Sequence, residues 1–233
     1  MSEPRANPSA LDRLGPLLLL VPLVAMLCCA YLQVEATAGL VLLVALICLG
    51  LFFRSFEGSR PTLRQVMPTA TLAAVAAAGR VAFAPLPDVK PVSAIAIVAG
   101  ATLGRRCCFM VGALAALVSN FFFGQGAWTP LQMYAWGLVG YLAGVLSDHH
   151  ALDSRPALCA YGFCSALLYG LILNGWHVLG FVRPLEWAPV LAAFAAGLPL
   201  DVLHGVSTAG FLLAIWLPWG RSIRRVVAKY GLS

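Results

Sequence analysis

Two ionisable residues stand close together in an apolar stretch near the end of the sequence, "GLPLDVLHGVSTAGF" (197–211). Asp201 and His204 are three residues apart, so on a helix they share one face. An ionisable side chain within a membrane span is costly and usually faces a cavity or a partner. The pair could contact a substrate or partner, serve an intramembrane enzyme, or form a structural bond at the kink that Pro199 predicts.

A second polar group interrupts the apolar sequence at "GRVAFAPLPDVKP" (79–91). Arg80, Asp88 and Lys90 stand there among three prolines. Prolines reduce the entropy that a loop loses when it closes on a ligand. The stretch therefore predicts a stiff loop that holds one acid and one base near a cavity. The alternative is a rigid connector to a short helix, because prolines are common in turns.

Motifs for nucleotide binding and hydrolysis are absent from the sequence. It contains no GxxxxGK[ST], no HExxH and no GxSxG pattern. The seven cysteines lie in apolar segments and form no CxxC pair, so we expect neither disulfides nor a metal site. We therefore expect no enzymatic activity, no cofactor and no ATP site in this chain.

The composition is that of an integral membrane protein. Of 233 residues, 61% are hydrophobic and 10% are charged, against about 45–50% and about 25% in soluble domains. A soluble fold of this size would lack the polar residues to cover its surface. The net charge of +6 does not indicate a nucleic-acid partner, because the basic residues lie between apolar runs and no nucleic-acid motif accompanies them.

Eight apolar segments predict an all-α membrane fold. They are residues 14–34, 37–53, 65–84, 91–104, 107–123, 130–147, 156–175 and 189–219. A span needs about 20 residues, so the segment 91–104 must be tilted, re-entrant or shielded by its neighbours. Residues 1–64 form a cytoplasmic tail, two plain spans and a polar linker from Arg54 to Gln65. Residues 65–233 form a six-helix core with a basic tail.

The distribution of basic residues predicts the orientation. If all eight segments cross, one side holds twelve of the fifteen lysines and arginines: Arg5, Arg13, Arg54, Arg60, Arg64, Arg105, Arg106, Arg155, Arg221, Arg224, Arg225 and Lys229. The other side holds Lys90 and Arg183, and Arg80 lies near the end of a span. Because basic loops stay inside, both termini should be cytoplasmic.

Alanines form a stripe on the third segment. Ala70, Ala74 and Ala78 recur every four residues, so they line one helix face where another helix can approach closely. That second helix could belong to this bundle or to a partner subunit.

Three stretches resemble a known family. They are "GRVAFAPLPDVKPVSAIAIVAGATLG" (79–104), "GALAALVSNFFFGQGAWTPLQMYAWGLVGYLAG" (112–144) and "LPLDVLH" (198–204). They are similar to the substrate-binding S components of energy-coupling factor (ECF) vitamin transporters, most of all to the cobalamin-type branch. The resemblance covers about residues 65–225 and leaves the first two helices outside.

The resemblance implies a function. An S component is a six-helix protein of the bacterial cell membrane that captures a vitamin on its outer face. It associates with a transmembrane coupling subunit and two cytoplasmic ATPases, and it is thought to topple to release the vitamin inside. In that family a small-residue stripe on the first core helix contacts the coupling subunit, which matches Ala70, Ala74 and Ala78, and the following loop covers the vitamin.

The vitamin itself stays open at this point, with riboflavin or a corrinoid precursor as alternatives to cobalamin. A structural or assembly protein, or an intramembrane enzyme that uses Asp201 and His204, are alternatives outside transport. We expect the ligand to bind among outer polar and aromatic side chains. The candidates are Phe83, Asp88, Lys90, Asn120, Gln125, Trp128, Tyr134, Trp136 and Trp176. Some of the tryptophans could instead be interfacial anchors.

Overall fold

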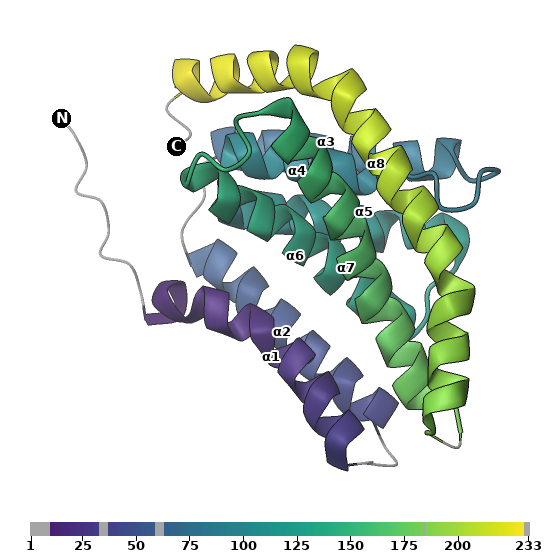
Figure 1. Ribbon diagram of the computed structural model, residues 1–233. Coiled ribbons are helices and arrows are strands. Elements are labelled where there is room, and N and C mark those ends of the chain that lie inside the picture. Colours follow the sequence, from purple (N-terminus) through teal and green to yellow (C-terminus); the bar gives the residue numbers. More distant parts are fainter. Residues whose placement is uncertain (1–9, 33–36, 59–62, 184, 231–233) are drawn as a thin grey trace.

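The computed structural model describes residues 10–32, 37–58, 63–183 and 185–230. Within these ranges every regular element is a helix, which confirms the predicted all-α class. Figure 1 shows the eight helices in chain order: α1 (Ala10–Leu32), α2 (Thr37–Gly58), α3 (Leu63–Ala82), α4 (Val92–Leu103), α5 (Arg105–Phe123), α6 (Trp128–Asp148), α7 (Arg155–Phe181) and α8 (Trp187–Tyr230).

Four helical stretches in the described residues are long and apolar enough to cross a membrane: Ala38–Gly58, Arg105–Phe123, Arg155–Phe181 and Trp187–Trp216. Three shorter apolar helical stretches accompany them: Leu17–Leu32, Val66–Ala82 and Val92–Leu103. A run of about 20 apolar residues in a helix matches the thickness of a bilayer core. The chain is therefore a helical membrane protein.

The short helix α4 lies inside the bundle. Its 12 residues extend only about 18 Å, too little to cross a bilayer. Every residue from Val92 to Gly100 is buried, and α4 packs against α3, α5, α6 and α8. Of the three possibilities for this segment, shielding by neighbouring helices is the one that the structure contains.

Helix α6 is the central helix of the bundle, in contact with α4, α5, α7 and α2. Small residues bring its backbone against that of α5. A Cβ atom on Gly112 of α5 would lie 2.3 Å from the carbonyl oxygen of Trp136, and one on Gly140 would lie 2.7 Å from that of Cys108. Such close approach is the usual reason for small residues at membrane helix interfaces.

The N-terminal hairpin of α1 and α2 packs against α6 and α7. The Tyr134 hydroxyl donates to the carbonyl oxygen of Leu19, and Nε1 of Trp176 donates to that of Ala38 at 3.2 Å. The polar linker is shorter than predicted, because α2 continues to Gly58 and α3 begins at Leu63. Residues 59–62 lie outside the described residues.

Helix α8 is 44 residues long and stays helical through Pro199 and Pro218. The kink expected at Pro199 therefore does not break the helix. Figure 1 shows that α8 bends over the bundle, so that its last part runs across one end of the molecule. The predicted basic tail is thus helical as far as Tyr230.

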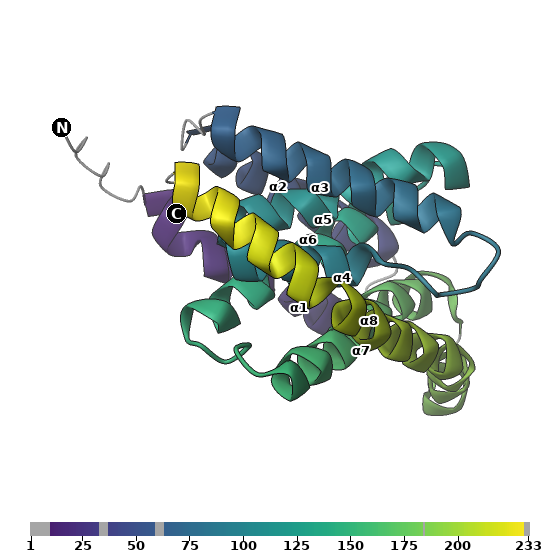
Figure 2. The same ribbon diagram turned by 90° about the horizontal axis from the view of Figure 1, so that it is seen from above.

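Successive helices run in opposite directions, which sorts their connections into two groups (Figure 2). The loops 83–91 and 124–127 lie at one end of the bundle, together with the end of α7 and the start of α8. The start of α1, the loop 149–154 and the end of α8 lie at the other. We call the first group the loop end and the second the basic end.

Candidate functional site

Arg80, in the last turn of α3, points into the bundle at the loop end. It is only 7% exposed. Its Nη1 donates to Ser119 Oγ and to Asn120 Oδ1, both at 2.7 Å. Nδ2 of Asn120 in turn donates to Thr129 Oγ1 at 3.0 Å and to Gln132 Oε1 at 2.8 Å. A buried cation thus joins α3 to α5, and Asn120 extends the network to α6.

Two aromatic rings lie close to the guanidinium. Its central carbon lies 4.6 Å from the centroid of Phe123 and 4.9 Å from that of Trp136. Trp136 also stacks against Tyr169, with ring centroids 4.6 Å apart. Cation–π attraction is strong where the cation is desolvated. These aromatic contacts therefore help to hold the guanidinium inside the bundle.

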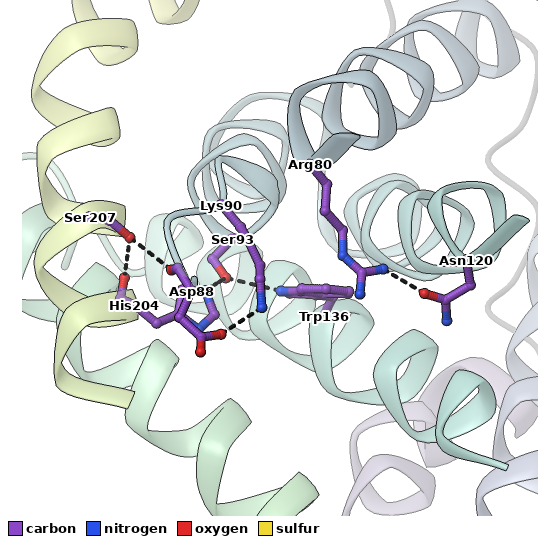
Figure 3. Close-up of polar contacts among 8 residues, drawn as sticks. All are labelled: Arg80, Asp88, Lys90, Ser93, Asn120, Trp136, His204 and Ser207. Atoms are coloured by element: carbon purple, nitrogen blue, oxygen red, sulfur yellow. Dashed lines mark hydrogen bonds and ion pairs between the residues drawn. The ribbon is translucent and has the colours of Figure 1, made fainter. Parts of the chain in front are cut away.

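A second chain of hydrogen bonds leads from Trp136 to α8 (Figure 3). Nε1 of Trp136 donates to Ser93 Oγ at 3.1 Å, and Ser93 Oγ lies 3.0 Å from Nε2 of His204. Because Ser93 already accepts from Trp136, its hydroxyl can donate to Nε2 of a neutral His204. His204 is 1% exposed, so this bond satisfies a buried ring nitrogen.

The loop 83–91 is fastened over this cluster. The Asp88 carboxylate and the Lys90 ammonium form an ion pair of 2.5 Å, and each side chain is about a quarter exposed. Ser207 Oγ on α8 donates to the backbone carbonyl of Asp88 at 3.3 Å, as Figure 3 shows. Asp88 has φ +54°, a left-handed conformation that is uncommon outside glycine.

At the base of the loop, Pro91 packs directly on α3. A Cβ atom on Gly79 would lie 2.6 Å from Cγ of Pro91, so only glycine lets the two segments approach this closely. Near the start of the loop, the ring of Phe83 meets that of Phe211 edge to face, 5.1 Å between centroids. Contacts of both ends with helices hold the loop in place.

Asp201 and His204 bind different partners. Nδ2 of Asn174 donates to Asp201 Oδ2 at 2.9 Å, whereas His204 bonds to Ser93. Gly170 leaves room for the Asp201 carboxylate against α7, since a Cβ atom there would lie 2.1 Å from Oδ1. The described contacts include no hydrogen bond between Asp201 and His204, so a direct structural bond between the two, one of the alternatives for this pair, is not formed.

The structure brings together only part of the predicted site. Arg80, Asp88, Lys90, Asn120, Trp136 and His204 meet in one cluster, which we call the Arg80 cluster, and Phe83 and Asp201 lie at its edge. Gln125 is exposed and donates to the carbonyl of Leu117, and Trp128 is 44% exposed. Tyr134 and Trp176 are buried elsewhere, against the N-terminal hairpin.

Sequence reasoning missed several members of the cluster: Ser93, Ser119, Thr129, Gln132, Tyr169 and Ser207. Most are small polar residues inside apolar segments. Such residues in a membrane helix find a partner in a neighbouring helix. The available signal was the position of Ser93, Ser119 and Thr129 near the loop-end termini of their helices.

The alanine stripe faces outward. Ala70, Ala74 and Ala78 are exposed, whereas Ala73 and Ala77 between them are buried in the bundle. No helix among the described residues therefore covers the stripe, and close approach by a helix from outside is sterically open.

A groove of about 670 Å³ lies away from the Arg80 cluster, between α1, α7 and the start of α8. Its lining is apolar apart from Glu186. The cluster and the groove are different places, and only the cluster contains the convergent polar groups that orient a ligand.

A protein family described as "Family of unknown function (DUF6580)" matches residues 59–216, about two thirds of the chain. The match begins after the N-terminal hairpin and includes every residue of the Arg80 cluster. No curated protein and no solved structure matches the chain.

Proposed function

We infer that this chain, which belongs to the DUF6580 family, is the substrate-binding S component of an ECF-type importer. It would bind a vitamin at the loop end and pass it on through a transmembrane coupling subunit that two cytoplasmic ATPases drive. The observation that carries the proposal is Arg80, a cation 7% exposed inside a membrane protein and covered by a fastened loop. Buried ionisable residues in membrane proteins usually serve function.

The composition of the Arg80 cluster supports a binding role. Ligand sites combine apolar and aromatic walls with a few placed polar groups. Trp136 and Tyr169 supply aromatic wall, while Lys90 and Asp88 lie in a loop that could open to admit a ligand. A bound vitamin would then replace some of the contacts that now fasten the loop.

The cobalamin-type branch remains the favoured ligand class, with riboflavin and a corrinoid precursor as alternatives. The intramembrane enzyme is a weaker candidate, because Asp201 and His204 are engaged by different partners. A carboxylate and an imidazole that act together in catalysis need direct contact or one bridging water.

The two-helix extension preceding the six-helix core is part of the same proposal. The hairpin lies outside the family match, yet Tyr134 and Trp176 bond it to the core. We propose that it moves with the core as one unit.

The first prediction concerns topology. Both termini should face the cytoplasm of a bacterial cell, because twelve basic residues would lie on one side and two on the other if the chain reverses direction at each of the eight segments. In the structure the start of α1 and the end of α8 share the basic end. Fusions of alkaline phosphatase to either terminus should be inactive, and fusions of green fluorescent protein should fluoresce. Active phosphatase at either terminus would reverse the orientation.

The second prediction tests ligand binding directly. Protein purified gently in detergent should release a small organic molecule on denaturation, identified by mass spectrometry. Lys90→Ala should lower its amount per protein about tenfold or more, since hydrogen bonds to charged groups contribute roughly 1.5–3 kcal/mol.

Arg105→Ala is the matched control. Arg105 pairs with Asp148 at 2.5 Å at the basic end, far from the loop, in an exposed pair of small energetic value. If the two variants and the wild type release equal amounts of the small molecule per protein, the loop 83–91 is only a connector between helices. Absence of any released molecule from all three proteins would count against a binding component.

A further inference from the structure

We propose that the bound molecule carries an anionic group, a carboxylate or a phosphate, that pairs with the Nε–Nη2 edge of Arg80. The inference deepens the proposed function and rests on it for the identity of the site as a transport site. The anion-binding property itself follows from the geometry of one side chain.

The hydrogen bonds that Arg80 donates all come from one side of its guanidinium group. Both described hydrogen bonds leave from Nη1, to Ser119 and Asn120. A guanidinium has five N–H donors, of which Nη1 supplies two. Among the described residues, none accepts from Nε or Nη2. Arg80 is 7% exposed as a residue and keeps three donors without a protein partner, and these atoms are not among the fully buried polar atoms of the described residues, so they are open to a ligand.

The free edge has the shape of an anion fork. Phe123 and Trp136 both lie within 5 Å of the guanidinium carbon, so aromatic rings take up part of the space around it. The opposite edge is occupied by Ser119 and Asn120. What remains is two parallel N–H groups, a geometry that matches carboxylate and phosphate oxygens bidentately.

No carboxylate in the described part of the chain forms an ion pair with Arg80. The Asp88 carboxylate attracts the guanidinium from a distance, but its direct partner is Lys90 at 2.5 Å, and the Asp201 carboxylate accepts from Asn174 at 2.9 Å. Ser119 and Asn120 are neutral. A buried charge without an ionic partner is costly, which leaves a strong preference for an anion that enters the site.

Lys90 reinforces this preference. Figure 3 shows Arg80 and Lys90 both pointing toward Trp136, with Asn120 beyond the guanidinium. Lys90, which lies in the loop 83–91 and pairs with Asp88, is a second cation near the site. Among the vitamins considered above, cobalamin contains a phosphodiester, whereas riboflavin has no ionised group at neutral pH, so this inference favours the former.

The test uses small anions as probes on the full chain in detergent. Sodium phosphate and sodium acetate are titrated against sodium chloride at matched ionic strength, and the unfolding midpoint is followed by tryptophan fluorescence. The wild type should show a saturable rise of the midpoint, because a ligand that binds the folded state stabilises it by mass action. Arg80→Gln should lose the rise, and Arg80→Lys, which keeps the charge without the fork, should need at least about tenfold more anion.

Arg105→Gln serves as control and should respond like the wild type, because Arg105 lies at the basic end with Asp148. If Arg80→Gln does not fold, the test is the anion concentration that raises the unfolding midpoint in Arg80→Lys, compared with that in the wild type. An absent response in the wild type, or an equal response in the Arg80 variants, overturns the anion site.

The outcomes separate this inference from the proposed function. Suppose that the rise of the unfolding midpoint with phosphate or acetate depends on Arg80, but cells that express the complex take up no vitamin. The anion site is then supported and the importer proposal is wrong. If the cells take up vitamin and the molecule released from the purified protein is neutral or cationic, the importer proposal is supported and the proposal of an anionic ligand is wrong.

Discussion

Replacing Gly112 by valine should leave little folded protein. A Cβ atom at this position would lie 2.3 Å from the carbonyl oxygen of Trp136 and 2.8 Å from the nitrogen of Gly137. Both are backbone atoms of α6, so no side-chain rotation can relieve the clash, and α5 must move away from α6. Overpacking costs about 1–3 kcal/mol where side chains can adjust, and more where they cannot.

The measurement is the amount of monodisperse protein after detergent extraction and the unfolding midpoint of what remains. A loss of about 3 kcal/mol corresponds to a midpoint lower by roughly 6–12 °C for a chain of this length. Gly50→Val in α2 is the matched control, because nothing lies within 4 Å of a Cβ atom there. Similar behaviour of both variants would show that α5 and α6 do not pack as described.

The helices were predictable because each one is a long apolar run in the sequence, and polar residues, prolines or glycines separate one run from the next. Each of the eight predicted segments corresponds to an observed helix. The short segment 91–104 is the most informative case, since it coincides with α4 within a residue at each end. Pro91 and Gly104 bound it, and both residue types mark helix ends. The end of α8 was harder to predict, because the basic residues after Pro218 are typical of a cytoplasmic tail outside the helix.

The site was predictable only to the level of its loop. Arg80, Asp88 and Lys90 were found because charged residues are conspicuous in an apolar sequence. The sequence did not show which of the candidate aromatic residues join the Arg80 cluster and which pack elsewhere. Tyr134 and Trp136 are two positions apart on α6, which places them about 200° apart around the helix axis. Trp136 therefore reaches the Arg80 cluster, whereas Tyr134 faces the N-terminal hairpin and bonds to Leu19.

Partners across helices depend on rotation and tilt that no local pattern encodes. Ser93 joins the cluster because α4 turns it toward both Trp136 and His204. A serine in an apolar helix has the same local sequence whether it bonds to its own backbone or to a neighbour. Such contacts become visible only when the packing of all helices is known.

Ala74→Trp should abolish vitamin uptake and leave ligand binding nearly intact. Ala74 is exposed in the middle of the stripe, while Ala73 and Ala77 pack into the bundle. A tryptophan therefore extends outward without disturbing the fold. If a helix of the coupling subunit docks on the stripe, its close approach depends on the small side chains and the indole prevents it.

Two readouts in the same variant separate docking from binding. Uptake by cells that express the whole complex should fall at least about tenfold, while mass spectrometry of the purified variant should still find the small molecule. Ala160→Trp, an exposed alanine on α7, controls for the general effect of an added indole and should transport normally. Normal uptake by Ala74→Trp would mean that the stripe faces only lipid. Loss of the bound molecule from Ala74→Trp would instead place the stripe within the binding fold, because a docking surface acts on the coupling step and not on the capture of the ligand.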